Sequence, residues 1–332
     1  SYLAGGLSFL ISPLYPAIDP KTGKEYEKRY PGPNLTNPRY ERRFYFDIYQ
    51  RYGVLGNAFV ELEPIKNLKI RTRVGTDMYF VRGNAEIKAS YDFASQGQRR
   101  KNFSYGFTNT MTNTIEYAFN INDDHNFTVL GGHEGIKMSS DFFAASSSGQ
   151  IDDHLMLLQN GKKESYSVSE EAADMRALSF FGRIDYDYKN RYFLDLSLRN
   201  DANSRFGKDN RNAMFWATGF LWKVKNEAFM NDYKWIDDLN FKVSYGTQGN
   251  SAIGDYAALG LIGATTNYDT NAAWVYAQPS NPNLTWEKQS MFSLTLDGKL
   301  FHKLDFELMY YLRKTSNMLM GVPYPYTSGY GS

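Results

Sequence analysis

Long runs in which apolar and polar residues alternate constrain this chain more than any other feature of its sequence. In the cleanest run, residues 304–313, Leu, Phe and Tyr occupy the even positions, while Asp305, Glu307 and Arg313 are among the odd positions that alternate with them. Successive side chains of a β-strand point to opposite faces, so a period of two predicts strands with one apolar and one polar face. The same pattern recurs in residues 68–78, 180–188, 192–199 and 239–246.

The number and the length of these runs set the fold class. Weaker copies, in which Thr, Asn or Gly dilute one face, cover residues 105–119, 127–133, 214–224 and 292–300. Together the runs predict about ten strands of about ten residues each, the length of a strand that crosses a membrane in a barrel. Ordinary sheet strands have only about five or six residues. The sequence therefore predicts an all-β chain that forms part of an antiparallel transmembrane β-barrel.

The connections between the runs alternate in length. We expect tight connections at 64–67, 122–125, 189–190 and 301–303, long polar ones at 82–102, 139–175 and 248–283, and an intermediate one at 204–211. Residues 226–237 break the rhythm, because twelve residues stand where a tight turn is due, and they leave room for a helical turn. A meander with two unlike ends is typical of outer-membrane barrels, which have short periplasmic turns and long extracellular loops.

Alternation alone fits a second fold class equally well, namely a soluble sheet with one buried face, such as a carbohydrate-binding β-sandwich. Strand length and the rhythm of the connections favour the membrane barrel. In a barrel the apolar face contacts lipid and the charged face lines a wet interior, with all backbone groups paired between strands. We expect Arg71, Arg183 and Arg313 to point inward, because an Arg in the middle of the lipid face costs about 2–4 kcal/mol.

Composition excludes several other classes of protein. A mean hydropathy of −0.52 does not fit a bundle of membrane helices, which needs repeated apolar runs of about 20 residues. A net charge of +1 lacks the basic surplus that binding to nucleic acid requires, so no nucleic-acid partner is expected. Because the chain has no Cys, it has no disulfide, no thiolate metal site and no Cys nucleophile.

Motifs for catalysis and for metal binding are also missing. The four His residues lack metal-ligand spacing, and residues 249–253 lack the second Gly of a G-x-S-x-G nucleophile elbow because Ile253 occupies its position. Residues 161–163 lack the upstream glycine spacing of a phosphate-binding loop. We therefore expect no enzymatic activity, no catalytic residues and no metal or cofactor site.

Binding is the chemistry for which the sequence offers candidate residues. The long connection 248–283 carries four aromatic residues amid Asn and Thr: Tyr256, Tyr268, Trp274 and Tyr276. Aromatic rings with polar atoms can stack on a polar ligand and donate hydrogen bonds to it. The alternative is that these rings only pack the loops together. Both interpretations stay open at this point.

Four stretches resemble motifs of the SusC/RagA type of TonB-dependent transporters. They are residues 199–207 (RNDANSRFG), 245–256 (YGTQGNSAIGDY), 281–287 (NPNLTWE) and the closing segment with Val322, Pro323 and 327–329. Ala202 occupies a position where Gly is common in the family. In order and spacing, the resemblance covers nearly the whole chain.

The resemblance implies a bacterial outer-membrane importer with a barrel of about 22 strands and an N-terminal plug in its lumen. In that case residues 1–332 are a barrel portion, and the plug, the segment that contacts the TonB complex and the last strands lie outside them. The family implies a SusD-like lipoprotein lid and an oligosaccharide or peptide substrate. A passive porin or a structural outer-membrane barrel without a plug is the alternative.

Overall fold

The computed structural model describes Pro16 and residues 18–26, 37–92, 94, 96–268, 271–323, 325 and 327. The chain divides into two compact units. Unit 1 consists of residues 1–55, 77–107 and 139–173, and unit 2 consists of residues 56–76, 108–138 and 174–332. Of the closing motif, Ser328 and Gly329 lie outside the described residues.

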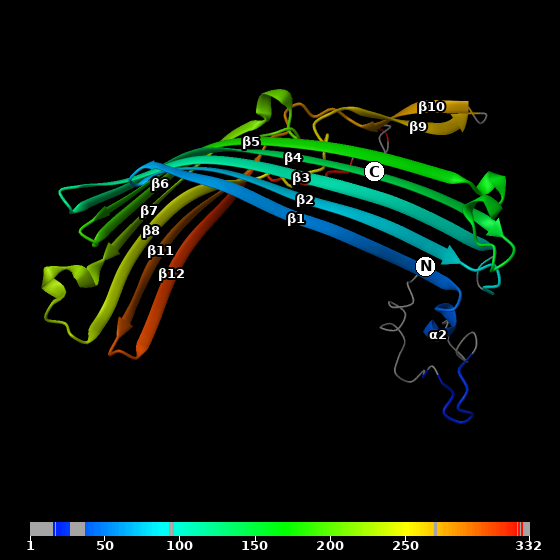
Figure 1. Ribbon diagram of the computed structural model, residues 1–332, viewed down its shortest axis with the longest axis horizontal. Helices are drawn as coiled ribbons and strands as arrows, with labels where there is room; N and C mark the ends of the chain where they lie inside the picture. The colour runs from blue at the N-terminus through cyan, green and yellow to red at the C-terminus, as the bar shows by residue number, and fades with distance from the viewer. Residues whose placement is uncertain are drawn as a thin grey trace. The chain divides into compact units, whose positions relative to one another are not determined.

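Ten strands of the described chain form one sheet, in the order β1-β2-β3-β4-β5-β6-β7-β8-β11-β12 (Figure 1). Their bounds are β1 (Tyr45–Ile65), β2 (Leu68–Ile87), β3 (Gly97–Ile121), β4 (His125–Gln150), β5 (Ser167–Tyr188), β6 (Tyr192–Asn203), β7 (Asn212–Lys223), β8 (Ile236–Asn250), β11 (Glu287–Leu300) and β12 (Leu304–Ser316). Neighbours from β5 to β12 pair antiparallel. A separate antiparallel hairpin consists of β9 (Leu261–Tyr268) and β10 (Asn271–Gln278).

The strands of unit 2 carry an exposed apolar face. Leu194 and Leu196 of β6 are 36% and 43% exposed, and Leu308 of β12 is 65% exposed. The register aligns such side chains across strands, because Leu296 pairs with Phe241 on one side and with Leu308 on the other. A β-sandwich would bury this face against a second sheet. The exposed face and the single ten-stranded sheet of the described residues agree with the predicted barrel portion and not with a soluble β-sandwich.

The tight connections of unit 2 lie where the sequence predicts them. Residues 122–124 join β3 to β4, and residues 189–191 join β5 to β6. Asn122, Lys189 and Asn190 have positive φ angles of 52°, 51° and 52°. Two-residue turns with positive φ match the right-handed twist of the flanking strands, and Asn tolerates this conformation better than other non-glycine residues.

The strands β2–β5 are longer than predicted, and β1 corresponds to none of the alternating runs named from the sequence. The strands β2–β5 have between 20 and 26 residues, where the sequence predicted about ten. Residues 82–102 and 139–175, predicted as long connections, contain strand ends, since only residues 88–96 and 151–166 separate the strands there. Where both faces of a sheet meet water, backbone pairing continues although the apolar alternation stops, so the pattern underestimates the strand. The connection 248–283 likewise contains the hairpin β9–β10.

The twelve-residue exception near 226–237 contains two short helical turns, η4 (Val224–Asn226) and η5 (Ala228–Met230). Further single turns are η1 (Leu158–Asn160), η2 (Lys163–Ser165) and η3 (Lys208–Asn210), and the one α-helix of the described chain is α2 (Pro38–Glu41). In the part of the chain that the structure describes, no helix has the length and apolar character needed to cross a membrane.

Unit 1 has a small aromatic cluster of its own. The rings of Tyr40 and Phe44 have centroids 4.8 Å apart, and Phe44 stacks on Tyr91 at 5.7 Å. Tyr40 directs its hydroxyl to Asp92 Oδ2 at 2.7 Å. These contacts hold helix α2 against the connection that follows β2.

Candidate functional site

A buried aromatic core lies where the long connections of unit 2 meet. Phe206, Phe215 and Trp286 are its large members. The ring centroids of Phe206 and Trp286 are 4.9 Å apart, and Phe215 meets Trp286 edge-on at 5.7 Å. Phe206 belongs to the connection between β6 and β7, Phe215 to β7, and Trp286 directly precedes β11. We call this core and the connections around it the loop junction.

Two glycines let the backbones of the loop junction approach closely. A Cβ atom at Gly207 would lie 1.9 Å from the carbonyl oxygen of Pro282. A Cβ atom at Gly249 would lie 2.2 Å from the ring of Phe215. Gly207 also donates its backbone N–H to the carbonyl of Leu284 at 3.3 Å. Only glycine fits such approaches, and the contact of Gly207 with Pro282 joins two of the motifs that resemble the SusC/RagA type.

Polar side chains connect the same segments. The Arg205 guanidinium donates through Nε to Asp255 Oδ1 at 2.8 Å and through Nη1 to the carbonyl of Ser251 at 3.3 Å. The indole Nε1 of Trp286 donates to the carbonyl of Arg211 at 2.8 Å. The motifs at 199–207, 245–256 and 281–287 therefore form one interlocked structure, although up to 80 residues separate Phe206 from Trp286. The sequence analysis identified the motifs, but it did not predict that they contact one another.

The hairpin β9–β10 presents two of the predicted ligand-contact residues. Trp274 and Tyr276 are 75% and 71% exposed. They are two positions apart on β10, so their side chains leave the same face of the hairpin. They pair in register with Ala264 and Ile262 of β9. Tyr268 ends β9, and its side chain lies outside the described residues.

Tyr256 lies apart from these two residues and makes structural contacts. Its hydroxyl accepts a hydrogen bond from the backbone N–H of Asp174 at 2.9 Å. Gln278 at the end of β10 donates through Nε2 to the carbonyls of Tyr256 and Leu259 at 3.1 and 2.7 Å. Tyr256 has a φ of 61°, a conformation that costs a tyrosine energy unless its surroundings impose it. These hydrogen bonds supply that constraint and attach the hairpin to the connection after β8.

The polar face of unit 2 carries an ion-pair network that sequence analysis missed. Arg199 on β6 donates through Nε to Asp201 Oδ1 at 2.6 Å and through Nη2 to Glu134 Oε1 at 3.1 Å. The same Nη2 donates to Ser179 Oγ on β5 at 2.9 Å. The sequence shows charged residues at odd positions of 192–199, and Arg199 is one of them. This pattern does not identify Glu134 on β4 as the partner of Arg199.

The residues that the structure describes contain no candidate metal centre. No group of three His, Asp or Glu side chains in them is arranged to hold a metal. His154 approaches only Asp152, with Nδ1 and Oδ1 3.1 Å apart, and Asp152 and His154 lie exposed between β4 and β5. The chemistry that these residues can perform is recognition by aromatic, hydrogen-bonding and charged groups.

Comparison with known proteins identifies this arrangement. Residues 7–332 match the family described as TonB dependent receptor-like, beta-barrel. TonB-dependent receptor P26 of Formosa agariphila is 30% identical over 292 residues, which are 85% of this chain and 30% of that protein. TonB-dependent receptor SusC of Bacteroides thetaiotaomicron is 35% identical over 156 residues, which are 45% of this chain and 16% of that protein.

A solved structure agrees with these relatives. The RagAB peptide transporter superposes with a TM-score of 0.86 at 34% sequence identity, over 92% of this chain and 35% of that chain. The chain thus spans about a third of the length of the relatives that it matches. From the match over residues 7–332, the chain belongs to the TonB-dependent receptor β-barrel family, whose members are transporters of the bacterial outer membrane and not enzymes.

Proposed function

We propose that this chain forms part of the wall and the mouth of an outer-membrane importer that takes up an oligosaccharide or a peptide. The observation that carries the proposal is the hairpin β9–β10, which offers Trp274 and Tyr276 on the side of the long connections and is attached there through Gln278. Long connections face the outside in outer-membrane barrels, so these rings meet an incoming solute first. Stacking and hydrogen bonding by such rings suit both classes of substrate.

In our proposal, the rest of the importer lies outside this chain. A plug domain, the segment that contacts the TonB complex and the remaining strands of a barrel of about 22 strands belong to the other two thirds of the protein. Support comes from the relatives, since the chain covers 30% of receptor P26 and 35% of the RagAB chain. Residues 1–332 thus contribute barrel strands and loops, and import is driven through the missing part.

We propose a SusD-like lipoprotein as the partner at the mouth. Support comes from the similarity to SusC and to the RagAB peptide transporter. The loop junction suits such a partner, because a lid that opens and closes needs a rim that keeps its shape. Phe206, Trp286 and the pair Arg205–Asp255 provide this rigidity on the side of the long connections.

The hairpin is tested by uptake of labelled oligosaccharides and peptides into cells that carry the whole transporter. Replacing Trp274 and Tyr276 together by Ala should lower uptake at limiting substrate by about tenfold, because truncating a ligand-contacting aromatic costs about 1–2 kcal/mol. The control is Phe229→Ala, since Phe229 is 60% exposed in η5, at the end with the short turns. Equal uptake by both variants would mean that the hairpin rings only pack loops.

Active import is tested separately from substrate contact. Dissipating the proton-motive force, or deleting the plug and the TonB-contacting segment, should abolish accumulation of the labelled substrate. A passive porin would keep transporting under both conditions. Continued uptake would therefore show that the protein is a passive porin and not an active importer. This conclusion would not depend on the results for the hairpin variants.

A further inference from the structure

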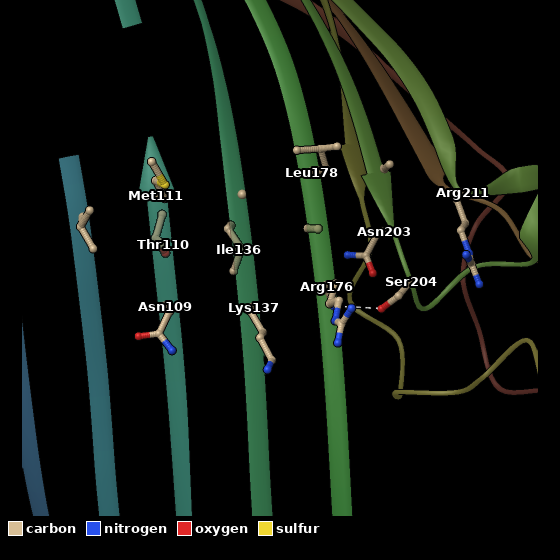
Figure 2. A pocket seen from close by; sticks show the side chains of 14 residues that line it. Asn109, Thr110, Met111, Ile136, Lys137, Arg176, Leu178, Asn203, Ser204 and Arg211 are labelled. Atoms are coloured by element: carbon tan, nitrogen blue, oxygen red, sulfur yellow. Dashed lines mark hydrogen bonds between the residues drawn. The ribbon is translucent and has the colours of Figure 1, made fainter. Parts of the chain in front are cut away.

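An open groove of about 570 Å³ lies in unit 2, beside the end of β6 (Figure 2). Its floor is mainly apolar and comes from the face that carries the exposed Leu and Phe side chains. Leu178 of β5 and Ala202 of β6 lie directly opposite each other in the register, and Val74 of β2 and Met111 of β3 extend the floor. Val74, Met111 and Leu178 are exposed. In a barrel this is the lipid-facing surface.

Three cationic side chains border this apolar floor. Lys137 on β4, Arg176 on β5 and Arg211 before β7 line the groove, and Figure 2 shows that they come from three separate segments. All three are exposed, and the lining contains no carboxylate. Within the described residues none of the three forms an ion pair with Asp or Glu. The backbone N–H of Arg176 donates to Ser204 Oγ at 2.9 Å, which fixes β5 against the end of β6.

Counted from the short turn, the length of β5 places the groove at the outer boundary of an apolar band of ordinary height. Leu178 is ten residues from Tyr188, the residue that ends β5 at the short turn. At about 3.3 Å per residue and a tilt of about 40°, ten residues rise about 25 Å, the height of the lipid-facing band of an outer-membrane barrel. Arg176 follows two positions further toward the long connections, on the same face. The cations therefore lie level with the headgroups of the outer leaflet, and the floor lies level with its acyl chains.

We propose that this groove is a binding site for a phosphorylated lipid of the outer leaflet. An acyl chain lies over Leu178, Ala202 and Met111, and phosphate oxygens accept hydrogen bonds from Lys137, Arg176 and Arg211. Guanidinium groups bind phosphate through paired N–H groups, and Lys adds a point charge. Cations exposed to the lipid boundary without carboxylate partners would otherwise be unfavourable there. The proposal needs only the outer-membrane location, and so it is independent of the proposed import.

The role of the three cationic side chains is tested with the whole transporter in detergent, which is incubated with lipid A that carries two phosphates. Bound lipid is counted by native mass spectrometry. The triple variant K137Q/R176Q/R211Q should retain about tenfold less lipid, because hydrogen bonds between charged groups account for at least that factor. The control K66Q/K163Q/K208Q removes three exposed lysines outside the groove and should bind like the unchanged protein.

The apolar floor is tested by filling it. A Cβ atom at Gly135, which lines the groove, meets no atom within 4 Å, so Gly135→Phe places a ring in the groove without a backbone clash. Gly131→Phe is the matched control, because Gly131 lies four residues away on the same face of β4 but outside the groove. Retention of lipid A should fall for Gly135→Phe alone. Thermal unfolding of each variant identifies any that has failed to fold.

Two further measurements distinguish a phosphorylated lipid from a lipid without phosphate and from free phosphate. Dephosphorylated lipid A should be retained about tenfold less than the phosphorylated form, by the same reasoning. Inorganic phosphate at millimolar concentration should not displace the lipid. Equal retention by the charge variant and its control would overturn the proposal. So would equal retention of dephosphorylated lipid, or displacement by inorganic phosphate, since the groove would then bind any apolar chain or any anion.

Discussion

The Nε atom of Arg205 lies 2.8 Å from Oδ1 of Asp255, and this ion pair joins the connection after β6 to the connection after β8. Both side chains are mostly shielded from solvent, with exposures of 21% and 26%. A shielded, hydrogen-bonded pair contributes more to stability than a surface ion pair. Asp255 is followed directly by Tyr256, whose backbone carbonyl is bonded to the hairpin through Gln278. The pair therefore supports the connection to which the aromatic hairpin is attached.

We expect Arg205→Met and Asp255→Asn each to speed protease cleavage within residues 251–260 by about tenfold, because losing a partner of a shielded pair costs about 1–2 kcal/mol of local opening free energy. The double variant should be cleaved little faster than either single variant, since the shared contact is then already lost. Rates are measured on the folded protein at low protease concentration. Additive effects would show that the two side chains act independently.

Gly207 provides a second test of the loop junction. We expect Gly207→Ala to lower the midpoint of thermal unfolding, because the new Cβ would lie 1.9 Å from the carbonyl oxygen of Pro282 and would push two backbones apart. Overpacking of this kind costs about 1–3 kcal/mol. The control is Gly254→Ala, where a Cβ atom meets nothing within 4 Å. Similar midpoints for both variants would contradict a tight junction.

The sequence predicted the fold of unit 2 more accurately than that of unit 1, for a physical reason. Between Leu194 and Leu198 apolar and polar residues alternate strictly, so the two faces of β6 can be assigned from the sequence. In unit 1, Glu86 on β2 pairs with Arg99 on β3. Residues 82–87 of β2 and 97–102 of β3 are mostly polar and show no apolar alternation, so the strand ends there could not be predicted.

The contact that forms the candidate site was not predictable from local pattern. Phe206 and Trp286 meet because two connections fold back over the end of β7, and no period links residues 80 positions apart. The motifs around them were visible only through family resemblance. Trp274 and Tyr276 were predictable as candidates because they are large aromatic residues amid Asn and Thr in a long connection, where they can stack on a polar ligand. Their contact with a ligand stays a prediction.

Spin labels distinguish the two faces of the sheet in the whole protein in liposomes. Labels at Leu194, Leu196 and Leu308 should collide with oxygen dissolved in lipid and be protected from a water-soluble nickel complex, because these side chains are on the exposed apolar face. Labels at Ser197 and Glu307, on the opposite face, should give the reverse pattern. Accessibility to nickel at Leu194 or Leu308 equal to that at Ser197 would contradict the assignment of the faces.

Glu227, in the connection between η4 and η5 at the end with the short turns, is the strongest candidate for a pH-dependent contact. Its Oε1 accepts hydrogen bonds from the Tyr192 hydroxyl at 2.5 Å and from Trp222 Nε1 at 3.2 Å. Arg191 Nη1 lies 3.3 Å from its Oε2. The hydrogen bond from Tyr192 is the largest cause that lowers the pKa of Glu227 below its ordinary value of 4.5.

A lowered pKa in the folded state makes the contribution of Glu227 to stability depend on pH. The folded protein binds fewer protons here than the unfolded chain, so the contribution is fully present above pH 4.5 and is lost as the pH falls through the lower, folded pKa. We therefore expect Glu227→Gln to unfold at a lower temperature than the unchanged protein at pH 7, and the difference to shrink below pH 4.5. Glu164→Gln, an exposed glutamate in η2, is the control for the charge change. The difference in unfolding temperature between the unchanged protein and Glu227→Gln could instead stay constant from pH 7 to pH 3. In that case the ionised carboxylate would not be what holds the ends of β6 and β7 to this connection.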